Sequence, residues 1–182
     1  MAKNAHIQEQ LYQELGSFLS KFKDENENEY FETVMNQLPY LDAFLKETLR
    51  KYPPILFMAR ICNTDNYRLG NVVLEKGQVV NIIPTLFHLN ADYYKDPFTF
   101  DPSRFMPENK HLLVPYTYLP FSLGPRNCVA MRFAYQELKL CFASLVRKFK
   151  FENTLTTPDE LIVKKGIGIL QTEPFSIKVS KR

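Results

Sequence analysis

The residues with the most chemical meaning lie in one short stretch, residues 121–130, which reads Phe-Ser-Leu-Gly-Pro-Arg-Asn-Cys-Val-Ala. Its cysteine, Cys128, follows a Gly-Pro turn and comes just before a segment whose apolar residues have helical spacing. Backbone N–H groups at a helix N-terminus and the nearby guanidinium of Arg126 favour the anionic thiolate. A stabilised thiolate can act as a nucleophile, a redox thiol or a metal ligand.

The spacing of residues around Cys128 decides among these chemistries. A phosphatase nucleophile needs an arginine six residues downstream, where this chain has Ala134, and a dithiol motif needs a second cysteine in place of Met131. The other cysteines, Cys62 and Cys141, lack the paired spacing of a structural zinc site. What remains is a lone thiolate ligand to a metal cofactor, and haem fits because the porphyrin supplies four ligands itself. A buried structural cysteine is the plain alternative.

The same stretch closely resembles the haem-binding signature of the cytochrome P450 superfamily, the haem-thiolate monooxygenases. The resemblance implies that Cys128 is the axial ligand of the haem iron and that Phe121 packs near the thiolate. It also implies that Gly124 permits the sharp loop and that Arg126 meets a haem propionate. Ala130 stands where the family most often has glycine, which lets the following helix lie close under the porphyrin.

A second constellation is the Glu-x-x-Arg formed by Glu47 and Arg50 on a predicted helix. Residues three apart share a helix face, so taken alone this is a common surface ion pair. In the family, such a pair meets an arginine from a Pro-x-Arg-Phe element, which here is Pro102–Phe105 with Ser103 in place of the usual acidic residue. The resemblance implies a structural role for Glu47, Arg50 and Arg104, tying the helix to the cysteine loop.

Arg60 and the histidines are weaker candidates. Arg60 lies in an apolar run, where a cation without an anion is costly. The resemblance implies that a haem propionate supplies that anion, and the open alternative is an edge strand with Arg60 facing water. His6, His88 and His111 are dispersed without ligand spacing, so we interpret them as structural or surface residues.

Hydrophobic periodicity predicts the elements that position these residues. Helical spacing predicts helices over residues 5–23, 39–52 and 129–149. Apolar runs between turn signals predict strands at residues 57–62, 72–74, 79–83, 161–163 and 175–179. The polar run 23–29 is predicted to be a solvated loop, and residues 93–120 a long, irregular, packed stretch.

These elements predict a mainly α protein with small β-sheets, an α+β fold class. The resemblance implies the C-terminal, proximal half of the cytochrome P450 fold, truncated at the N-terminus, because the family's oxygen-binding helix would precede residue 1. We expect one haem-binding portion over residues 1–182. Its parts are a helical region 1–52, strands and packed loop 53–120, the cysteine-ligand loop 121–128, a helix 129–149 and short strands 150–182.

Composition excludes other function classes. A formal net charge of +3 in 182 residues, without a basic run, does not indicate nucleic-acid binding. Three cysteines without paired spacing are typical of a reducing compartment. No apolar stretch is long enough for a membrane span, so membrane association is expected only through the missing N-terminal part.

The resemblance also implies the activity. It is a monooxygenase that inserts one oxygen atom from O₂ into a lipophilic organic substrate, with haem b as cofactor and electrons from NADPH through a flavoprotein reductase. The basic residues Arg132, Lys139 and Lys148 are expected to help the reductase dock. The expected location, as in eukaryotic microsomal members, is the cytosolic face of the endoplasmic reticulum. No catalytic residue beyond the haem ligand is expected, and the isolated chain is expected to be inactive. The alternative is a non-catalytic fragment that binds haem or a partner protein.

Overall fold

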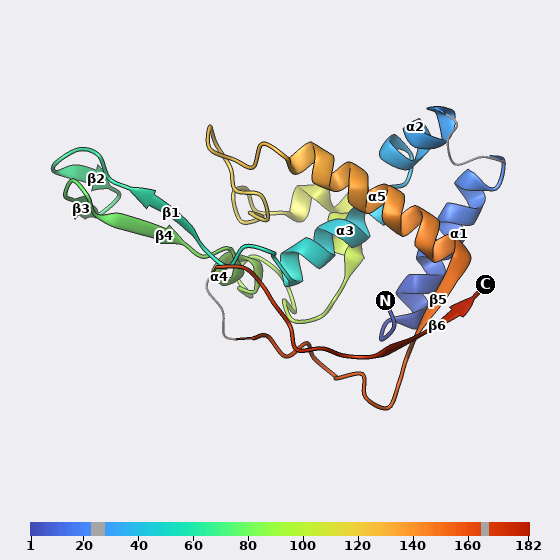
Figure 1. Ribbon diagram of the computed structural model, residues 1–182. Coiled ribbons are helices and arrows are strands. Elements are labelled where there is room, and N and C mark those ends of the chain that lie inside the picture. The colour runs from blue at the N-terminus through green and yellow to red at the C-terminus, as the bar shows by residue number, and fades with distance from the viewer. Residues whose placement is uncertain (23–27, 165–167) are drawn as a thin grey trace.

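A computed structural model describes residues 1–22, 28–164 and 168–182 of the chain, which form a helical body with small sheets at its margins (Figure 1). The helices are α1 (Ala5–Leu19), α2 (Asn28–Asn36), α3 (Pro39–Lys51), α4 (Pro84–His88), the 3₁₀ helices η1 (Pro102–Phe105) and η2 (Pro107–Leu112), and α5 (Met131–Lys148). The strands are β1 (Met58–Ile61), β2 (Tyr67–Leu69), β3 (Val72–Leu74), β4 (Val79–Ile82), β5 (Phe149–Asn153) and β6 (Ile177–Lys181).

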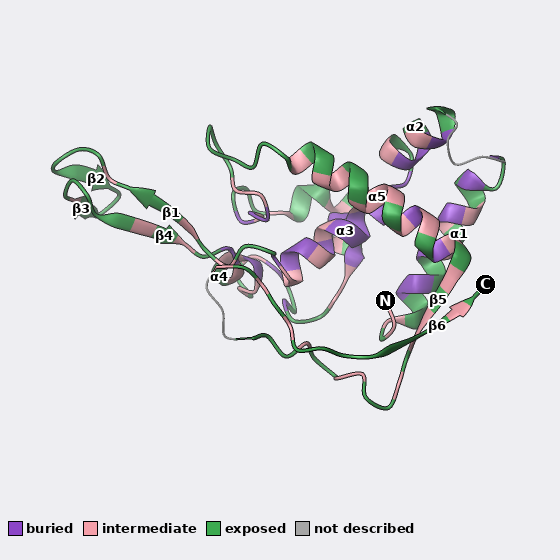
Figure 2. Ribbon diagram, in the orientation of Figure 1, coloured by how far each residue is buried: buried purple, intermediate pink, exposed green. Residues whose placement is uncertain are grey.

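The core lies where α1, α2, α3 and α5 meet, and Figure 2 shows the buried residues gathered there. Leu11 and Leu15 of α1, Leu41 and Leu45 of α3, and Val146 of α5 are almost completely shielded from solvent. Their spacing of three or four residues puts each apolar set on one face of its helix. Burying these faces against one another is the main free-energy gain that holds the helices together.

The start of α3 is capped by a side chain from α1. Pro39 occupies the first turn, and the Glu14 carboxylate accepts hydrogen bonds from Tyr40 N at 2.7 Å and from Leu41 N at 2.8 Å. These N–H groups have no partner within their own helix, so the carboxylate satisfies them. The cap therefore fixes where α3, the helix of the Glu-x-x-Arg pair, begins.

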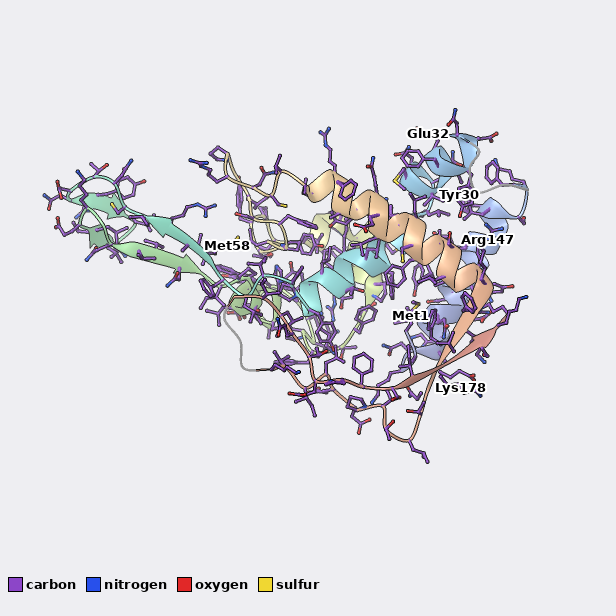
Figure 3. All side chains as sticks on the ribbon, viewed as in Figure 1. Met1, Tyr30, Glu32, Met58, Arg147 and Lys178 are labelled. Atoms are coloured by element: carbon purple, nitrogen blue, oxygen red, sulfur yellow. The ribbon has the colours of Figure 1, made fainter. Side chains whose placement is uncertain are left out.

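The arm is a two-stranded ribbon of β1 and β4 that projects from the helical body (Figure 1). The strands are antiparallel, with Met58 opposite Ile82, and β2 and β3 pair at the far tip. Met58, labelled in Figure 3, lies where the arm leaves the body, close to α4. Most side chains of the arm are exposed, so it contributes little to the core.

The other sheet pairs β5 with β6 near the C-terminus, with Phe149 opposite Lys181. Gln8 of α1 binds the edge of β5, since its amide nitrogen donates to Phe151 O at 2.9 Å and its oxygen accepts from Phe151 N at 2.7 Å. Gln8 is 1% exposed, so this reciprocal pair is shielded from water. It joins the first helix to the last sheet.

The predicted fold class is confirmed: the described residues are mainly helical with small antiparallel sheets. The helices predicted over 5–23, 39–52 and 129–149 correspond to α1, α3 and α5, but α1 ends at Leu19. Three strand predictions correspond to β1, β3 and β4, and that at 175–179 to β6, displaced by two residues. Near 161–163 only an isolated bridge forms, between Val163 and Thr172. The assignment of residues 1–182 to one haem-binding portion stays a prediction.

Hydrophobic periodicity did not predict α2, the short helix α4, the 3₁₀ helices η1 and η2, the short strand β2, or β5, whose first residue the sequence assigned to the preceding helix. Of the predicted loop 23–29, residues 23–27 lie outside the described residues, while Asn28 and Glu29 begin α2, so for these two the prediction is wrong. Among the described residues, no helix is both long and apolar enough to cross a membrane.

Candidate functional site

The cysteine loop folds back on itself just before α5. Cys128 N donates to Phe121 O at 2.9 Å, and Asn127 N donates to Gly124 O at 3.1 Å. Two residues of the loop have left-handed backbone, Gly124 at φ +82° and Ser122 at φ +63°. A residue with a side chain, such as Ser122, adopts left-handed backbone at a free-energy cost of about 1–3 kcal/mol, so the surrounding contacts must impose this conformation.

The thiol of Cys128 is exposed, and the next residue, Val129, is fully exposed. The alternative that Cys128 is only a buried structural cysteine is therefore wrong. The first residue of α5 is Met131, and Ala130 takes the N-cap position with φ −88°. The thiol thus lies close to the start of a helix, with a small residue between them.

Aromatic side chains anchor the loop to two helices. The Phe121 ring packs against Tyr135 of α5 with ring centroids 5.3 Å apart. The Tyr118 hydroxyl donates to Lys46 O of α3 at 3.2 Å and lies 3.3 Å from the Tyr135 hydroxyl. Burial raises the pKa of both tyrosines, so both remain neutral. The loop is therefore held from α3 and from α5 at once.

A hollow of about 210 Å³ opens beside the thiol. It contains four of the six residues predicted to bind the cofactor: Cys128, Phe121, Arg126 and Arg60. The other two, Gly124 and Ala130, belong to the loop but do not line the hollow. The remaining lining residues are mostly apolar: Ile55, Met58, Pro84, Leu119, Pro120 and Ser122.

The charges at the hollow fit a group with an apolar body and anionic substituents. Arg60 reaches from β1 to the loop, where its Nη2 donates to Arg126 O at 3.5 Å, so two cationic side chains border one hollow. None of the described residues that line it has an acidic side chain. Arg60 is exposed and stands on a two-stranded ribbon, as the plain alternative expected. The thiol, apolar wall and two guanidiniums together match the iron, ring and propionates of haem.

The predicted ion cluster is assembled in the interior. Arg50 donates from Nε to Glu47 Oε2 at 2.7 Å and from Nη2 to Glu47 Oε1 at 2.8 Å, and both side chains are 0% exposed. Arg104 Nε lies 3.6 Å from Glu47 Oε1 without forming a hydrogen bond, while its Nη2 donates to Asp96 O. Asp101 N also donates to Glu47 Oε1 at 2.8 Å. The surface-pair alternative is therefore wrong for Glu47 and Arg50.

His88 is the residue that the sequence analysis undervalued. It is 0% exposed and lies at the end of α4, between α3 and the segment that enters the cysteine loop. Its backbone O accepts from Arg50 Nη1 at 2.6 Å, and its ring Nε2 accepts from Leu119 N at 2.8 Å. Burial, helped by the Arg50 charge and opposed by the hydrogen bond to Arg50 O, lowers its pKa from 6.5 to about 4. No spacing in the sequence signals these contacts.

Lys139 does not suit the docking role that the sequence suggested. Its side chain is 11% exposed, donates to Met35 O at 2.8 Å and lies 3.1 Å from Asp42. Burial raises the pKa of Asp42, but Lys46 and Lys139 outweigh that effect and hold it below its usual range. Lys139 therefore joins α5 to α2 and α3, whereas Arg132 is exposed.

The structure thus presents an exposed thiol on a loop before α5, with two arginines and mostly apolar side chains around the same hollow. Among the described residues, no cluster of histidine, cysteine or acidic side chains offers a competing metal site. The chain belongs to the cytochrome P450 family, whose sequence model, described as Cytochrome P450, matches residues 1–179. Membership implies haem b as the cofactor.

Relatives support the same assignment along the chain. It is 36% identical to cytochrome P450 9e2 of Blattella germanica over 186 residues, covering 100% of this chain and 34% of that protein. It is 39% identical to cytochrome P450 3A1 of Rattus norvegicus over 153 residues, covering 84% of this chain and 30% of that protein. Human cytochrome P450 3A7 is 36% identical over 152 residues, with 84% and 30% covered. The chain spans about a third of the length of these curated relatives.

Proposed function

We propose that this chain forms the haem-thiolate portion of a monooxygenase, with Cys128 as the axial ligand of the haem iron. The observation that carries the proposal is the meeting of Cys128, Arg60 and Arg126 at one hollow, although they come from two parts of the chain. An exposed thiol, an apolar wall and paired guanidiniums are the three features that a haem edge and its propionates need.

The chain's own residues would have distinct tasks. Arg60 and Arg126 would bind the carboxylates, Phe121 would pack near the sulfur, and Gly124 would make the turn that brings the thiol forward. Ala130, with a single methyl group, would allow the first turn of α5 to approach the ring. When bound, haem supplies the oxygen-activating chemistry, which an electron-rich thiolate ligand favours.

Glu47, Arg50 and Arg104 would serve structure and take no part in the chemistry. They are shielded from solvent or nearly so, and they contact backbone groups of α4 and of the segment that leads into η1. Buried charges that satisfy one another in this way are geometrically fixed. The cluster would therefore hold α3 to the segments that lie between it and the cysteine loop in the sequence.

For the whole protein, the proposal extends to insertion of one oxygen atom into a lipophilic substrate at the cytosolic face of the endoplasmic reticulum. Family membership supports this activity and the supply of electrons from a flavoprotein reductase. The exposed Arg132 and the last-turn residue Lys148 of α5 present positive charge for docking. Arg132→Glu should therefore slow reduction of bound haem by the reductase, most strongly at low ionic strength. Arg68→Glu, at the tip of the arm, is the control and should not slow reduction.

The test of the thiolate assignment uses the full 182-residue chain reconstituted with haemin. The wild-type chain should give the thiolate-type absorption spectrum in its reduced carbon monoxide complex. Cys128→Ser should abolish that spectrum, because a neutral hydroxyl cannot replace the sulfur anion. Cys62→Ser and Cys141→Ser are matched controls that should leave it unchanged. Survival of the thiolate spectrum in Cys128→Ser, or its absence from the wild type, would overturn the proposal.

A further inference from the structure

His88 uses both ring nitrogens in the interior of the protein. Nε2 accepts from Leu119 N at 2.8 Å, and Nδ1 lies 3.0 Å from Arg50 O. A backbone N–H can only donate, so Nε2 carries no proton; the proton of the neutral ring is then on Nδ1, which donates to Arg50 O. The two contacts together require one tautomer and exclude the doubly protonated ring.

His88 is tied to Arg50 twice, once through its ring and once through its backbone carbonyl, and its ring is tied once to the entry of the cysteine loop. Arg50 Nη1 donates to His88 O at 2.6 Å, while Nε and Nη2 hold the Glu47 carboxylate. Arg50 Nη2 also donates to Thr99 O at 3.4 Å. Because Arg50 is 0% exposed, this attachment does not compete with solvent. His88 is therefore fixed relative to α3 before any contact with the loop is considered.

Leu119 connects His88 to the loop that carries the thiol. Its N–H is held by His88, and its carbonyl accepts from Ser122 N at 3.3 Å, at the residue with φ +63°. Phe121, two residues after Leu119, accepts from Cys128 N at 2.9 Å. A continuous path of hydrogen bonds and covalent backbone thus runs from the buried carboxylate of Glu47 to the backbone of Cys128.

We propose that His88 is a positioning residue for the cysteine loop, and that its Nε2 acceptor for Leu119 N–H is the contact through which the buried ion cluster sets the position of Cys128. The ring does not touch the hollow, since it is absent from the lining. The consequence for the thiolate rests on the proposed function, whereas the consequence for the loop does not.

Two substitutions separate the two ring nitrogens. In His88→Gln, the amide oxygen at the ε position keeps an acceptor for Leu119 N–H. In His88→Asn, the shorter amide reaches only the δ position, so it keeps a donor for Arg50 O but leaves Leu119 N–H without a partner. Both variants are neutral and polar, so they control for each other in burial and charge.

The first measurement is amide hydrogen exchange in the full chain without haem. In His88→Asn, exchange at Leu119 and Cys128 should quicken about tenfold, as expected for loss of one backbone hydrogen bond, while the amides of α1 and α5 stay protected. In His88→Gln, both loop amides should stay close to wild type. Equal exchange at Cys128 in the two variants would overturn the inference.

The second measurement needs no variant and covers the case in which both substitutions unfold the chain. Nitrogen-15 spectra of wild-type His88 should show the neutral ring with its proton on Nδ1. A proton on Nε2 at neutral pH would refute the proposed contact.

The third measurement uses haemin-reconstituted chains. His88→Asn should lower the fraction of the reduced carbon monoxide complex that has the thiolate-type spectrum, whereas His88→Gln should preserve it. A wild-type chain without that spectrum refutes the proposed function but leaves the exchange result standing. A thiolate fraction that is normal in the wild type and equal in both variants would refute the role of His88 in positioning the thiol.

Discussion

Replacing Glu47 by glutamine tests the buried ion cluster most directly. The side chain keeps its shape but loses its charge, and its new NH₂ group cannot accept the hydrogen bonds that the neighbouring groups donate. In the wild type, Glu47 Oε1 accepts from Arg50 Nη2 and Asp101 N, each at 2.8 Å, and Oε2 accepts from Arg50 Nε at 2.7 Å. The variant can satisfy only part of this set, and it leaves the fully buried Arg50 cation without an anion.

The expected loss of folding free energy is large for one substitution. Removing one partner of a buried, hydrogen-bonded ion pair costs about 3–5 kcal/mol, because the other charge stays in the interior uncompensated. A domain has a total folding free energy of about 5–15 kcal/mol, so Glu47→Gln should remove about a fifth of it or more. The nearby Arg104 cation adds to the loss, since its Nε already lacks a hydrogen-bond partner.

Urea unfolding of the full chain, followed by circular dichroism, measures this loss. The matched control is Glu29→Gln, because Glu29 makes an ion pair with Lys21 at 3.0 Å in which both side chains are more than half exposed. An exposed pair is worth about 0–1 kcal/mol, so the control should shift the midpoint slightly. Equal midpoints for the two variants at an unchanged slope would refute the reasoning from burial.

Three further predictions follow from described contacts. The folded-state pKa of His88 is about 4, below the unfolded value of 6.5, so the unfolded chain binds the proton first and wild-type stability should fall as the pH drops from 6.5 to 4. Across that window, His88 should contribute about 3 kcal/mol of pH dependence to the free energy of unfolding measured in urea, and His88→Gln should lack it. The same change of unfolding free energy with pH in both proteins would contradict this. Gly124→Ala should destabilise the protein by about 1–2 kcal/mol because Gly124 has φ +82°. Gly16→Ala, inside α1, should instead stabilise it by up to about 1 kcal/mol. Shifts of the melting temperature with the same sign in both variants would refute the backbone argument. Gln8→Leu should cost about 1–3 kcal/mol because it leaves the N–H and C=O of Phe151 without their partners, and exchange at the Phe151 amide should quicken; unchanged exchange there would contradict this.

Local patterns in the sequence predicted the helices and the cysteine loop well. Helical spacing located α1, α3 and α5, because a buried stripe leaves its period in the sequence. It could not show that α5 ends at Lys148, since Phe149 continues the apolar stripe but pairs with Lys181 in β5. The strand β2 escaped prediction because its three residues are exposed and are ordered by pairing with β3.

The contacts that complete the site join residues far apart in the chain. His88 meets Leu119 across 31 positions, and Gln8 meets Phe151 across 143. The residue type alone predicts neither partner, because nothing in a linear sequence distinguishes a buried histidine or glutamine from an exposed one. Glu47, Arg50 and Arg104 were grouped only through the resemblance to a known family, and spacing alone suggested a solvent-exposed pair.

The contrast between the two sides of the hollow has a consequence for how a cofactor is captured. The thiol side is attached to α3 and α5 by hydrogen bonds and packed rings, so its conformational entropy is lost when the chain folds. The Arg60 side stands on an exposed ribbon and touches the loop through one contact of 3.5 Å. Under the proposed function, fixing the exposed Arg60 side chain against a bound cofactor would cost conformational entropy at the binding step, which subtracts from affinity. Mutations in the helical core should consequently change how the metal is ligated, whereas mutations in the arm should change how long the cofactor stays.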